Sequence, residues 1–286
     1  MDTELLTVVV WVKNNIFNYI LNILFMKSVI IYTYYNSIQS NINLAFFVKN
    51  ELTYKNNIDY IIVINGYNYP KTIIFPNLDN LTIIKRENIG FDFGGHNSAL
   101  NHIKTNNKSY DYFFFLNSGV IGPILPHYFT ESHWSNIFIK KITERVKLVG
   151  TTIVCLPPHD TGCYGPKVEG FFFMVDKIGL ELLQNTKTIF CDHPDKYSAI
   201  VNGEYGLSNC ILNNGFSIDC MLRKYQDIDW TDKKNYNLNY NRHPSRKNSF
   251  YGNSINPYEV VFHKWYWANE PSVNFELIQQ YINNNT

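Results

Sequence analysis

The chain has 286 residues, with 25 Lys and Arg residues against 24 Asp and Glu residues and a formal net charge of +1. This near-neutral charge argues against a general nucleic-acid-binding protein, which needs a basic surface to displace counterions from phosphates. Hydrophobic residues make up 45% and aromatic residues 16% of the chain, which excludes the composition of a disordered protein. Its five cysteines are scattered without a CxxC pair, which favours reduced thiols in a cytosolic protein over a zinc ribbon or a disulfide framework.

The N-terminal segment differs in character from the rest of the chain. Residues 5–26 are long enough to span a membrane, but Lys13 interrupts them and costs roughly 3 kcal/mol on insertion scales. Asp2 and Glu4 stand where a signal peptide would carry basic residues. We expect residues 1–26 to form a hydrophobic or amphipathic helix that packs on the main domain or on a partner. Peripheral contact with a membrane surface and a true membrane span are the alternatives.

From residue 27 onward, strand and helix patterns alternate. Continuous runs of β-branched and aromatic residues are typical of strands that are buried on both faces of a sheet. Their alternation with helical patterns predicts an α/β fold with a mostly parallel central sheet flanked by helices. The expected strands are Ser28–Tyr35, Asp59–Asn65, Leu81–Lys85, Tyr110–Leu116, Lys147–Leu156, Gly170–Val175 and Phe216–Cys220. The expected helices are Ser40–Leu52, Asp92–Thr105, His133–Val146, Gly179–Asn185 and Glu204–Asn213.

Residues 225–257 are polar, rich in Asn, Lys and Tyr, and lack clear periodicity. A loop of this length inside a compact domain is usually a functional lid or a disordered segment. The chain shows no internal repeat and no linker. We therefore expect one domain over residues 27–267, with 225–257 as its flexible loop or lid, and a C-terminal tail or helix over residues 268–286.

The ends of the expected strands carry residues that suit ligand binding, at the edge where open α/β sheets place their sites. The third strand runs into RENIGFDFGGH at residues 86–96, where three glycines allow close approach of the backbone and Arg86 is a phosphate-type donor. The fourth strand ends in Asn117-Ser118-Gly119. The first of these segments does not have GxGxxG spacing, and the chain contains no GxxxxGK[ST], so neither a dinucleotide site nor a P-loop is supported. Taken alone, residues 86–96 fit a plain tight turn equally well.

Two further segments carry charged residues of interest. Glu204 is expected in the first turn of a helix, where the helix dipole stabilises a carboxylate and places it well to act as a base. A simple complement to the helix dipole is the alternative reading. His263 and Lys264 follow a strand-like run, and two adjacent donors suit a diphosphate; a solvated pair is the alternative.

In combination these segments are more informative. The sequence resembles the rhamnan synthesis F protein family, which comprises glycosyltransferases and glycosyltransferase-like proteins of bacteria, algae and large DNA viruses. The resemblance covers about residues 30–265 and rests on six segments in the family's order. They are Arg86–Gly95, Phe115–Pro126, Lys147–Cys155, Lys167–Leu183, Glu204–Cys220 and Asn256–Lys264.

The resemblance implies a GT-A-type nucleotide-sugar fold and transfer of a hexosyl or deoxyhexosyl group in polysaccharide biosynthesis. The implied donor is a UDP- or dTDP-linked sugar, and the implied acceptor is a glycan or glycoprotein hydroxyl. The implied location is the cytoplasm, that of a host cell if the chain is viral, and association with a membrane is the alternative. By position, the donor-binding residues would be Thr33, Tyr34, Tyr35, Arg86, Asn88, Gly90, Asp92, Gly94, Gly95, Asn117, Ser118, His263 and Lys264.

The sequence departs from the family at the expected metal site. Enzymes of this fold usually carry an Asp-x-Asp that binds Mn or Mg at the end of the fourth strand, where this chain has Asn117-Ser118-Gly119. Hard divalent cations prefer carboxylates, so metal dependence is in doubt. If a metal binds, Asp92, Asn117 and His263 are its candidate ligands. If none binds, the cations Arg86, His263 and Lys264 are expected to hold the leaving diphosphate.

The resemblance also places the catalytic groups. Glu204 falls at the position of the base of inverting enzymes, and Glu169 is the reserve base, at a position where relatives usually have an amide. The expected function is therefore that of an inverting glycosyltransferase. A catalytically inactive nucleotide-sugar-binding module, or a structural or assembly protein, is the alternative, and the missing acidic pair motivates the former.

Overall fold

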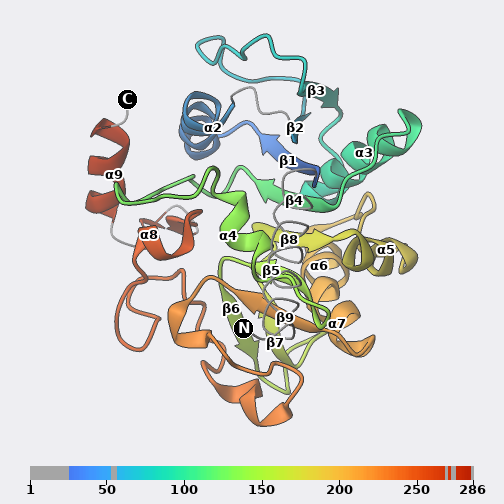
Figure 1. Ribbon diagram of the computed structural model, residues 1–286, viewed down its shortest axis with the longest axis vertical. Coiled ribbons are helices and arrows are strands. Elements are labelled where there is room, and N and C mark those ends of the chain that lie inside the picture. Colours follow the sequence, from blue (N-terminus) through green and yellow to red (C-terminus); the bar gives the residue numbers. More distant parts are fainter. Residues whose placement is uncertain (1–25, 53–56, 268–269, 272–274, 285–286) are drawn as a thin grey trace, which may run out of the picture.

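The computed structural model describes residues 26–52, 57–267, 270–271 and 275–284. At its centre lies a seven-stranded sheet in the order β3-β2-β1-β4-β8-β5-β9 (Figure 1). β8 is antiparallel to both of its neighbours, and the other adjacent pairs are parallel. The structure thus confirms the predicted α/β class and the mostly parallel central sheet. The strands are β1 Ser28–Tyr35, β2 Ile58–Asn65, β3 Leu81–Arg86, β4 Tyr112–Asn117, β5 Val146–Gly150, β8 Phe172–Asp176 and β9 Ser217–Cys220.

The strands form where the sequence has continuous apolar runs, because both faces of the sheet are covered by helices. Along β1, Val29 and Ile31 belong to one buried cluster, whereas Ile30 and Tyr32 belong to the cluster on the opposite face. Each such side chain contributes roughly 1.5–3 kcal/mol through its burial. The first face carries α3 Phe91–Thr105, α5 Lys177–Asn185 and α7 Tyr205–Asn213, and the second carries α2 Ile38–Glu51 and α4 Ser135–Ile139 (Figure 1).

The expected strand over Lys147–Leu156 is wrong. The chain bends after Gly150, and residues Ile153–Leu156 form β6, which pairs with β7 (Gly165–Val168) in a separate two-stranded sheet. The two segments pack closely at this bend, because a Cβ atom added at Gly150 would lie 2.4 Å from Val168 Cγ1. This second sheet carries Lys167 to the edge of the central one.

The expected helix over His133–Val146 is also too long, because α4 ends at Ile139. Beyond it, the Thr143 hydroxyl accepts hydrogen bonds from the backbone N–H groups of Arg145 and Val146. A side chain that bonds to the backbone two and three residues on competes with the helical pattern. The resulting turn leads directly into β5.

Residues 225–257 contain no strand and only short helical turns, as η2 (Arg223–Tyr225) and η3 (Lys233–Asn237). Buried side chains nevertheless hold this loop to the body. Trp230 is fully buried, and the Asn239 amide bonds to the backbone N–H of Cys155 and the carbonyl of Ile153 on β6. The loop is therefore seated over the small second sheet.

Beyond the loop, the chain forms α8 (Pro257–Val260), the short pair β10 (Tyr266–Trp267) and β11 (Glu270–Pro271), and α9 (Phe275–Asn284). The last of these shows that the C-terminal segment contains a helix, and Ile278 and Ile282 bury one side of it against Phe46 and Trp265. The expected N-terminal helix lies outside the described residues, apart from Met26. Within the part of the chain that the structure describes, no helix is long and apolar enough to cross a membrane.

Candidate functional site

A cavity of about 550 Å³ opens at the carboxyl edge of the central sheet. Asn117, the last residue of β4, and Asp92, in the first turn of α3, form part of its wall. The volume is within the range of small-molecule sites, and the position matches where open α/β sheets bind ligands. Two charged groups of side chains and several aromatic rings complete the lining.

Asp92 and Asn117 are joined directly. Asn117 Nδ2 donates to Asp92 Oδ2 at 2.7 Å, while Asn117 Oδ1 accepts the N–H of Gly119 at 2.8 Å. Burial raises the pKa of Asp92, although the hydrogen bond from Asn117 and the charge of Lys264 act in the opposite direction. The end of β4 and the first turn of α3 thus bring one amide and one carboxylate together in the cavity wall.

The glycines of the Arg86–Gly95 segment make room for protein atoms. Gly90 begins α3 with φ +71, a conformation that favours glycine. A Cβ atom at Gly94 would lie 2.3 Å from Asp192 Oδ1, and one at Gly95 would lie 2.4 Å from Thr33 Cγ2. The segment therefore packs the start of α3 closely onto β1 and onto the Asp192 side chain.

Arg86 is engaged within the protein. Its Nη2 lies 2.5 Å from Asp192 Oδ1, and its Nη1 donates to the carbonyl of Ile89 at 3.0 Å. The side chain does not line the cavity, and neither does exposed Asn88. Arg86 therefore braces the turn before α3 in this structure.

The end of β1 contributes less to the cavity than the sequence suggested. Thr33 and Tyr34 are buried, and Thr33 Oγ1 hydrogen-bonds to His96 Nδ1 at 2.9 Å. Ser118 is buried too, and its hydroxyl accepts the N–H of Tyr35. Tyr35 is 52% exposed, so of the residues predicted to meet the base and ribose it is the one that solvent reaches freely.

The inner wall of the cavity holds a buried charge network of Lys167, Glu169, Glu204 and His243. Lys167 Nζ donates to Glu169 Oε2 and to Glu204 Oε1, each at 2.9 Å. His243 Nδ1 and Glu169 Oε1 are 2.7 Å apart, and the N–H of Gly170 donates to Glu204 Oε1 at 3.0 Å. Lys167 and Glu169 are each 2% exposed, whereas the Glu204 side chain is 22% exposed. Of the two carboxylates, Glu204 is the accessible one.

The charges in this network stabilise one another. Burial alone would raise the pKa of Glu169, but Lys167 and His243 outweigh it and hold the pKa well below its usual range. Burial likewise would lower the pKa of Lys167, but the two carboxylates outweigh it and the pKa is raised. The network therefore contains an ammonium and an ionised Glu169 at neutral pH, in a setting where an unpaired charge would be strongly destabilising.

Glu204 is not in the first turn of a helix, which corrects the sequence-based expectation. The helix begins earlier, with α6 (Lys196–Ser198), and continues through a π-helical turn, η1 (Ala199–Glu204), into α7. Glu204 is the last residue of this π-helical turn, so a helix N-terminus does not account for its place. Such turns often occur at functional sites.

Cations and an indole ring form the outer wall of the cavity. Lys264 Nζ and Arg246 Cζ each lie 4.5 Å from the centre of the Trp267 ring, and Lys264 Nζ is 5.4 Å from the Phe171 ring. Lys196, on α6, is a further cation of the lining. These cations line the same cavity as Asp92, Glu169 and Glu204.

Sequence reasoning missed Lys167, His243, Arg246 and Trp267. His243 and Arg246 lie in the polar loop, where charged residues look solvated, and Trp267 lies further on, on β10. Lys167 had a usable signal, because Lys167 and Glu169 stand two residues apart beside an apolar run and such residues share one face of a strand.

His263 is placed differently from the cationic role expected of it. The ring is fully buried and does not line the cavity. Burial lowers the pKa of His263 to about 3, so the ring is uncharged at neutral pH. This placement does not support the predicted contact with a diphosphate or a metal.

The cavity lacks a converging set of metal ligands among the described residues. Among the described residues, no three His, Cys, Asp or Glu side chains converge on one point. Asp92 is the carboxylate beside Asn117, and the amide nitrogen of Asn117 faces it as a donor. The described side chains therefore do not form a set of protein ligands for Mn or Mg.

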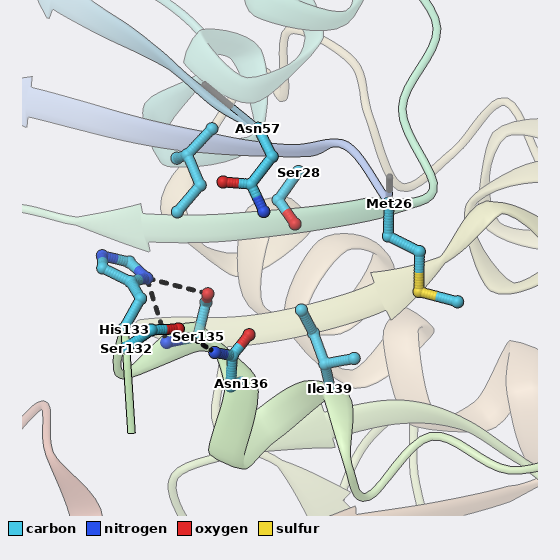
Figure 2. Close-up of a pocket in the computed structure, with 9 residues that line it drawn as sticks. Met26, Ser28, Asn57, Ser132, His133, Ser135, Asn136 and Ile139 are labelled. Carbon is cyan, nitrogen blue, oxygen red and sulfur yellow. Dashed lines mark hydrogen bonds between the residues drawn. The ribbon is translucent and has the colours of Figure 1, made fainter. Parts of the chain in front are cut away.

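A smaller pocket lies at the opposite edge of the sheet, beside the first residue of β1, Ser28 (Figure 2). His133 Nδ1 is 2.8 Å from Ser135 Oγ and accepts the N–H of Ser135, while His133 Nε2 is 2.7 Å from the buried Glu51 carboxylate. Ser135 is itself buried. These groups therefore satisfy one another and fix the start of α4.

No protein-family model matches the sequence, and no curated protein is significantly similar to it. Among solved structures, the fold is similar to a mannosyltransferase from Pyrobaculum calidifontis in complex with GDP-Man and Mn2+, with 11% identity and a TM-score of 0.43 over 68% of this chain and 54% of that one. It is also similar to the glycosyltransferase GlyE of Streptococcus pneumoniae TIGR4. The apo form has 10% identity and a TM-score of 0.32 over 68% of this chain and 44% of that one. A second GlyE structure has 9% identity and a TM-score of 0.34 over 71% and 46%.

The chain thus spans about half the length of each of these structures. TM-scores below 0.5 describe a distant likeness, which carries no conclusion about what this chain binds or transfers.

Proposed function

We propose that the chain is a glycosyltransferase that transfers a sugar from a nucleotide-diphosphate donor to a hydroxyl of a glycan or glycoprotein. One observation carries this proposal. Five of the six segments that resemble the rhamnan synthesis F family, although far apart in the sequence, supply residues to a single cavity. These residues include Asp92, Asn117, Glu169, Glu204 and Lys264.

Glu204 is the group best suited to act as the base. It lines the cavity, it is the more exposed of the two carboxylates in the buried charge network, and Lys167 and Gly170 both bind its Oε1. Among the described residues, no hydrogen bond reaches its Oε2. This second oxygen is therefore the one that can take the proton of an acceptor hydroxyl.

The proposed reaction is a single displacement with inversion. Glu204 removes the proton of the acceptor hydroxyl, and the oxygen attacks the anomeric carbon opposite the leaving group. The bond from this carbon to the diphosphate oxygen breaks, and its electron pair leaves with the nucleoside diphosphate. Lys264 and Arg246 neutralise the charge that develops on this group, which is the kind of stabilisation that a preorganised site supplies.

This arrangement suits a chain with a net charge of only +1. A local cluster of cations can hold a diphosphate where a basic surface is absent. The donor is proposed to be UDP- or dTDP-linked, with a hexosyl or deoxyhexosyl group, and the reaction is proposed to serve polysaccharide biosynthesis in the cytoplasm.

An inactive nucleotide-sugar-binding module is the second candidate. The observation that favours it is that an amide, Asn117, stands where an acidic metal ligand is usual, while Asp92 is bound to that amide. A structural or assembly protein is the third candidate, and it would bind no nucleotide at all.

Calorimetry and transfer assays with a panel of UDP-, dTDP- and GDP-linked sugars, each with and without Mn2+, test the proposal. We expect binding of one donor and transfer to a glycan acceptor, and we expect E204Q to abolish transfer while donor affinity survives. Near-normal turnover by purified E204Q would refute the role of Glu204. Binding without transfer or hydrolysis for every donor would favour the inactive module, and no binding would favour the structural protein.

A further inference from the structure

The buried charge network connects the loop over residues 225–257 to the proposed base. We propose that Lys167 and Glu169 are positioning residues that couple the seating of this loop, through His243, to the orientation of the Glu204 carboxylate. The inference rests on the proposed function in so far as Glu204 is the base.

The contacts run without a break from the loop to the base. His243 Nδ1 is 2.7 Å from Glu169 Oε1, Glu169 Oε2 is 2.9 Å from Lys167 Nζ, and the same Nζ is 2.9 Å from Glu204 Oε1. Each link is a hydrogen bond in which at least one partner carries a charge, and such bonds are the strong ones. A shift of the His243 side chain therefore changes the field and the geometry at Lys167.

The burial of the middle of the network makes the coupling strong. Lys167 and Glu169 are each 2% exposed, so water cannot replace a lost partner at little cost. Lys167 Nζ also lies 5.0 Å from the centre of the Tyr205 ring, next to Glu204. Lys167 Nζ is therefore held between the two carboxylates, and its position determines the position of Glu204 Oε1.

The position of the loop determines the position of His243. Four residues before it, the Asn239 side chain bonds to the backbone of Cys155 and Ile153 on β6, the strand that pairs with β7 and Lys167. His243 is thus held on the same small sheet that carries the ammonium. Arg246, three residues further on, reaches the Trp267 ring at the mouth of the cavity. One loop thus contacts both the network and the cationic side of the site.

The test compares variants that break the two ends of the network. H243L removes the bond to Glu169, and H243N keeps a nitrogen donor near the position of Nδ1. K167M/E169Q removes the buried positive and negative charges together, which avoids the uncompensated charge of a single substitution. The exposed ion pair of Lys140 and Glu131 provides a matched control, K140M/E131Q.

The kinetic readout is the turnover number of transfer, measured beside donor affinity. We expect H243L and K167M/E169Q each to lower kcat at least tenfold while the donor Kd of K167M/E169Q stays within threefold. H243N is expected to retain kcat within threefold. Because both changes act on one network, the combined variant should lose no more than threefold beyond the worse of the two. The proposal would be overturned if the losses of kcat in H243L and K167M/E169Q multiplied in the combined variant, or if K167M/E169Q had a normal kcat.

A second readout does not depend on transfer. Amide hydrogen exchange at residues 239–246 should be at least tenfold faster in K167M/E169Q and in H243L than in the parent, and unchanged in K140M/E131Q. If the parent transfers no sugar, faster exchange would support the coupling while the proposed function fails. Unchanged exchange in both folded variants would refute the coupling whatever the activity.

Discussion

Lys167 Nζ lies 2.9 Å from Glu204 Oε1 on one side and 2.9 Å from Glu169 Oε2 on the other, with the ammonium almost wholly buried between them. An ammonium in such a place is tolerated only when paired charges replace its water. The pairing holds one oxygen of Glu204 and, among the described residues, no hydrogen bond reaches the other. A surface glutamate would have no such fixed direction.

Gly170 should be needed for the orientation of the Glu204 carboxylate. A Cβ atom at this position would lie 2.7 Å from Glu204 Cγ, so alanine must displace the glutamate side chain. We expect G170A to lower kcat at least tenfold while the protein remains folded. G206A is the control, because its added Cβ would meet Ile189 at 3.1 Å and leave Glu204 untouched. Steady-state kinetics of G170A and G206A measure this effect. Equal kcat values would show that the orientation of the Glu204 side chain does not matter for turnover.

Lys264 should contribute more to donor affinity than other lysines. It lines the cavity beside Trp267, whereas Lys233 is exposed on the outer part of the loop. We expect K264Q to weaken the donor Kd at least tenfold, or about 1.4 kcal/mol, and K233Q to leave it within twofold. Calorimetry with the nucleoside diphosphate alone isolates this effect from the sugar. Similar losses in both variants would mean that general charge, and not this site, holds the diphosphate.

Much of the fold could be predicted because a strand that is buried on both faces needs an unbroken run of apolar residues, which the sequence shows directly. The run Ser28–Tyr35 is apolar throughout since both faces of β1 are covered, and the structure places β1 over the same residues. The break after Gly150 could not be predicted in this way. At this point the chain packs closely against Val168, eighteen residues further on, and no local pattern records such a contact.

The candidate site was predictable in part for the same reason. Asp92 and Asn117 lie next to strand and helix ends that the sequence marks, and both line the cavity. Glu204 lines it too, although it is not in the first helical turn where the sequence predicts it. His243 and Arg246 were missed because only tertiary packing brings their loop over the site. The same packing turns Arg86 toward Asp192, which no local pattern could indicate.

The Arg86–Asp192 pair provides a test of what that turn does. The two side chains are 13% and 48% exposed, so solvent screens the pair and we expect a coupling of only about 0.5–1 kcal/mol. A double-mutant cycle of R86Q and D192N, followed by urea unfolding, measures it. Both single variants should affect donor affinity equally, since either one loosens the start of α3. A loss of affinity in R86Q alone would show instead that Arg86 contacts the donor.

His263 should make the protein sensitive to acid. Burial lowers its pKa to about 3, against about 6.5 in an unfolded chain, so below pH 6.5 the unfolded state binds a proton that the folded state refuses. The contribution of His263 to stability therefore falls as the pH drops from 7 toward 3, by about 2 kcal/mol at pH 5.

H263L removes the titrating ring and keeps a similar volume. The difference between H263L and the parent in free energy of unfolding should be larger at pH 5 than at pH 7.5, by about 2 kcal/mol in favour of the variant. Urea unfolding at the two pH values measures this difference, with H127Q at an exposed histidine as the control. A difference that is the same at both pH values would show that the folded state accepts the proton on His263 as readily as the unfolded chain does.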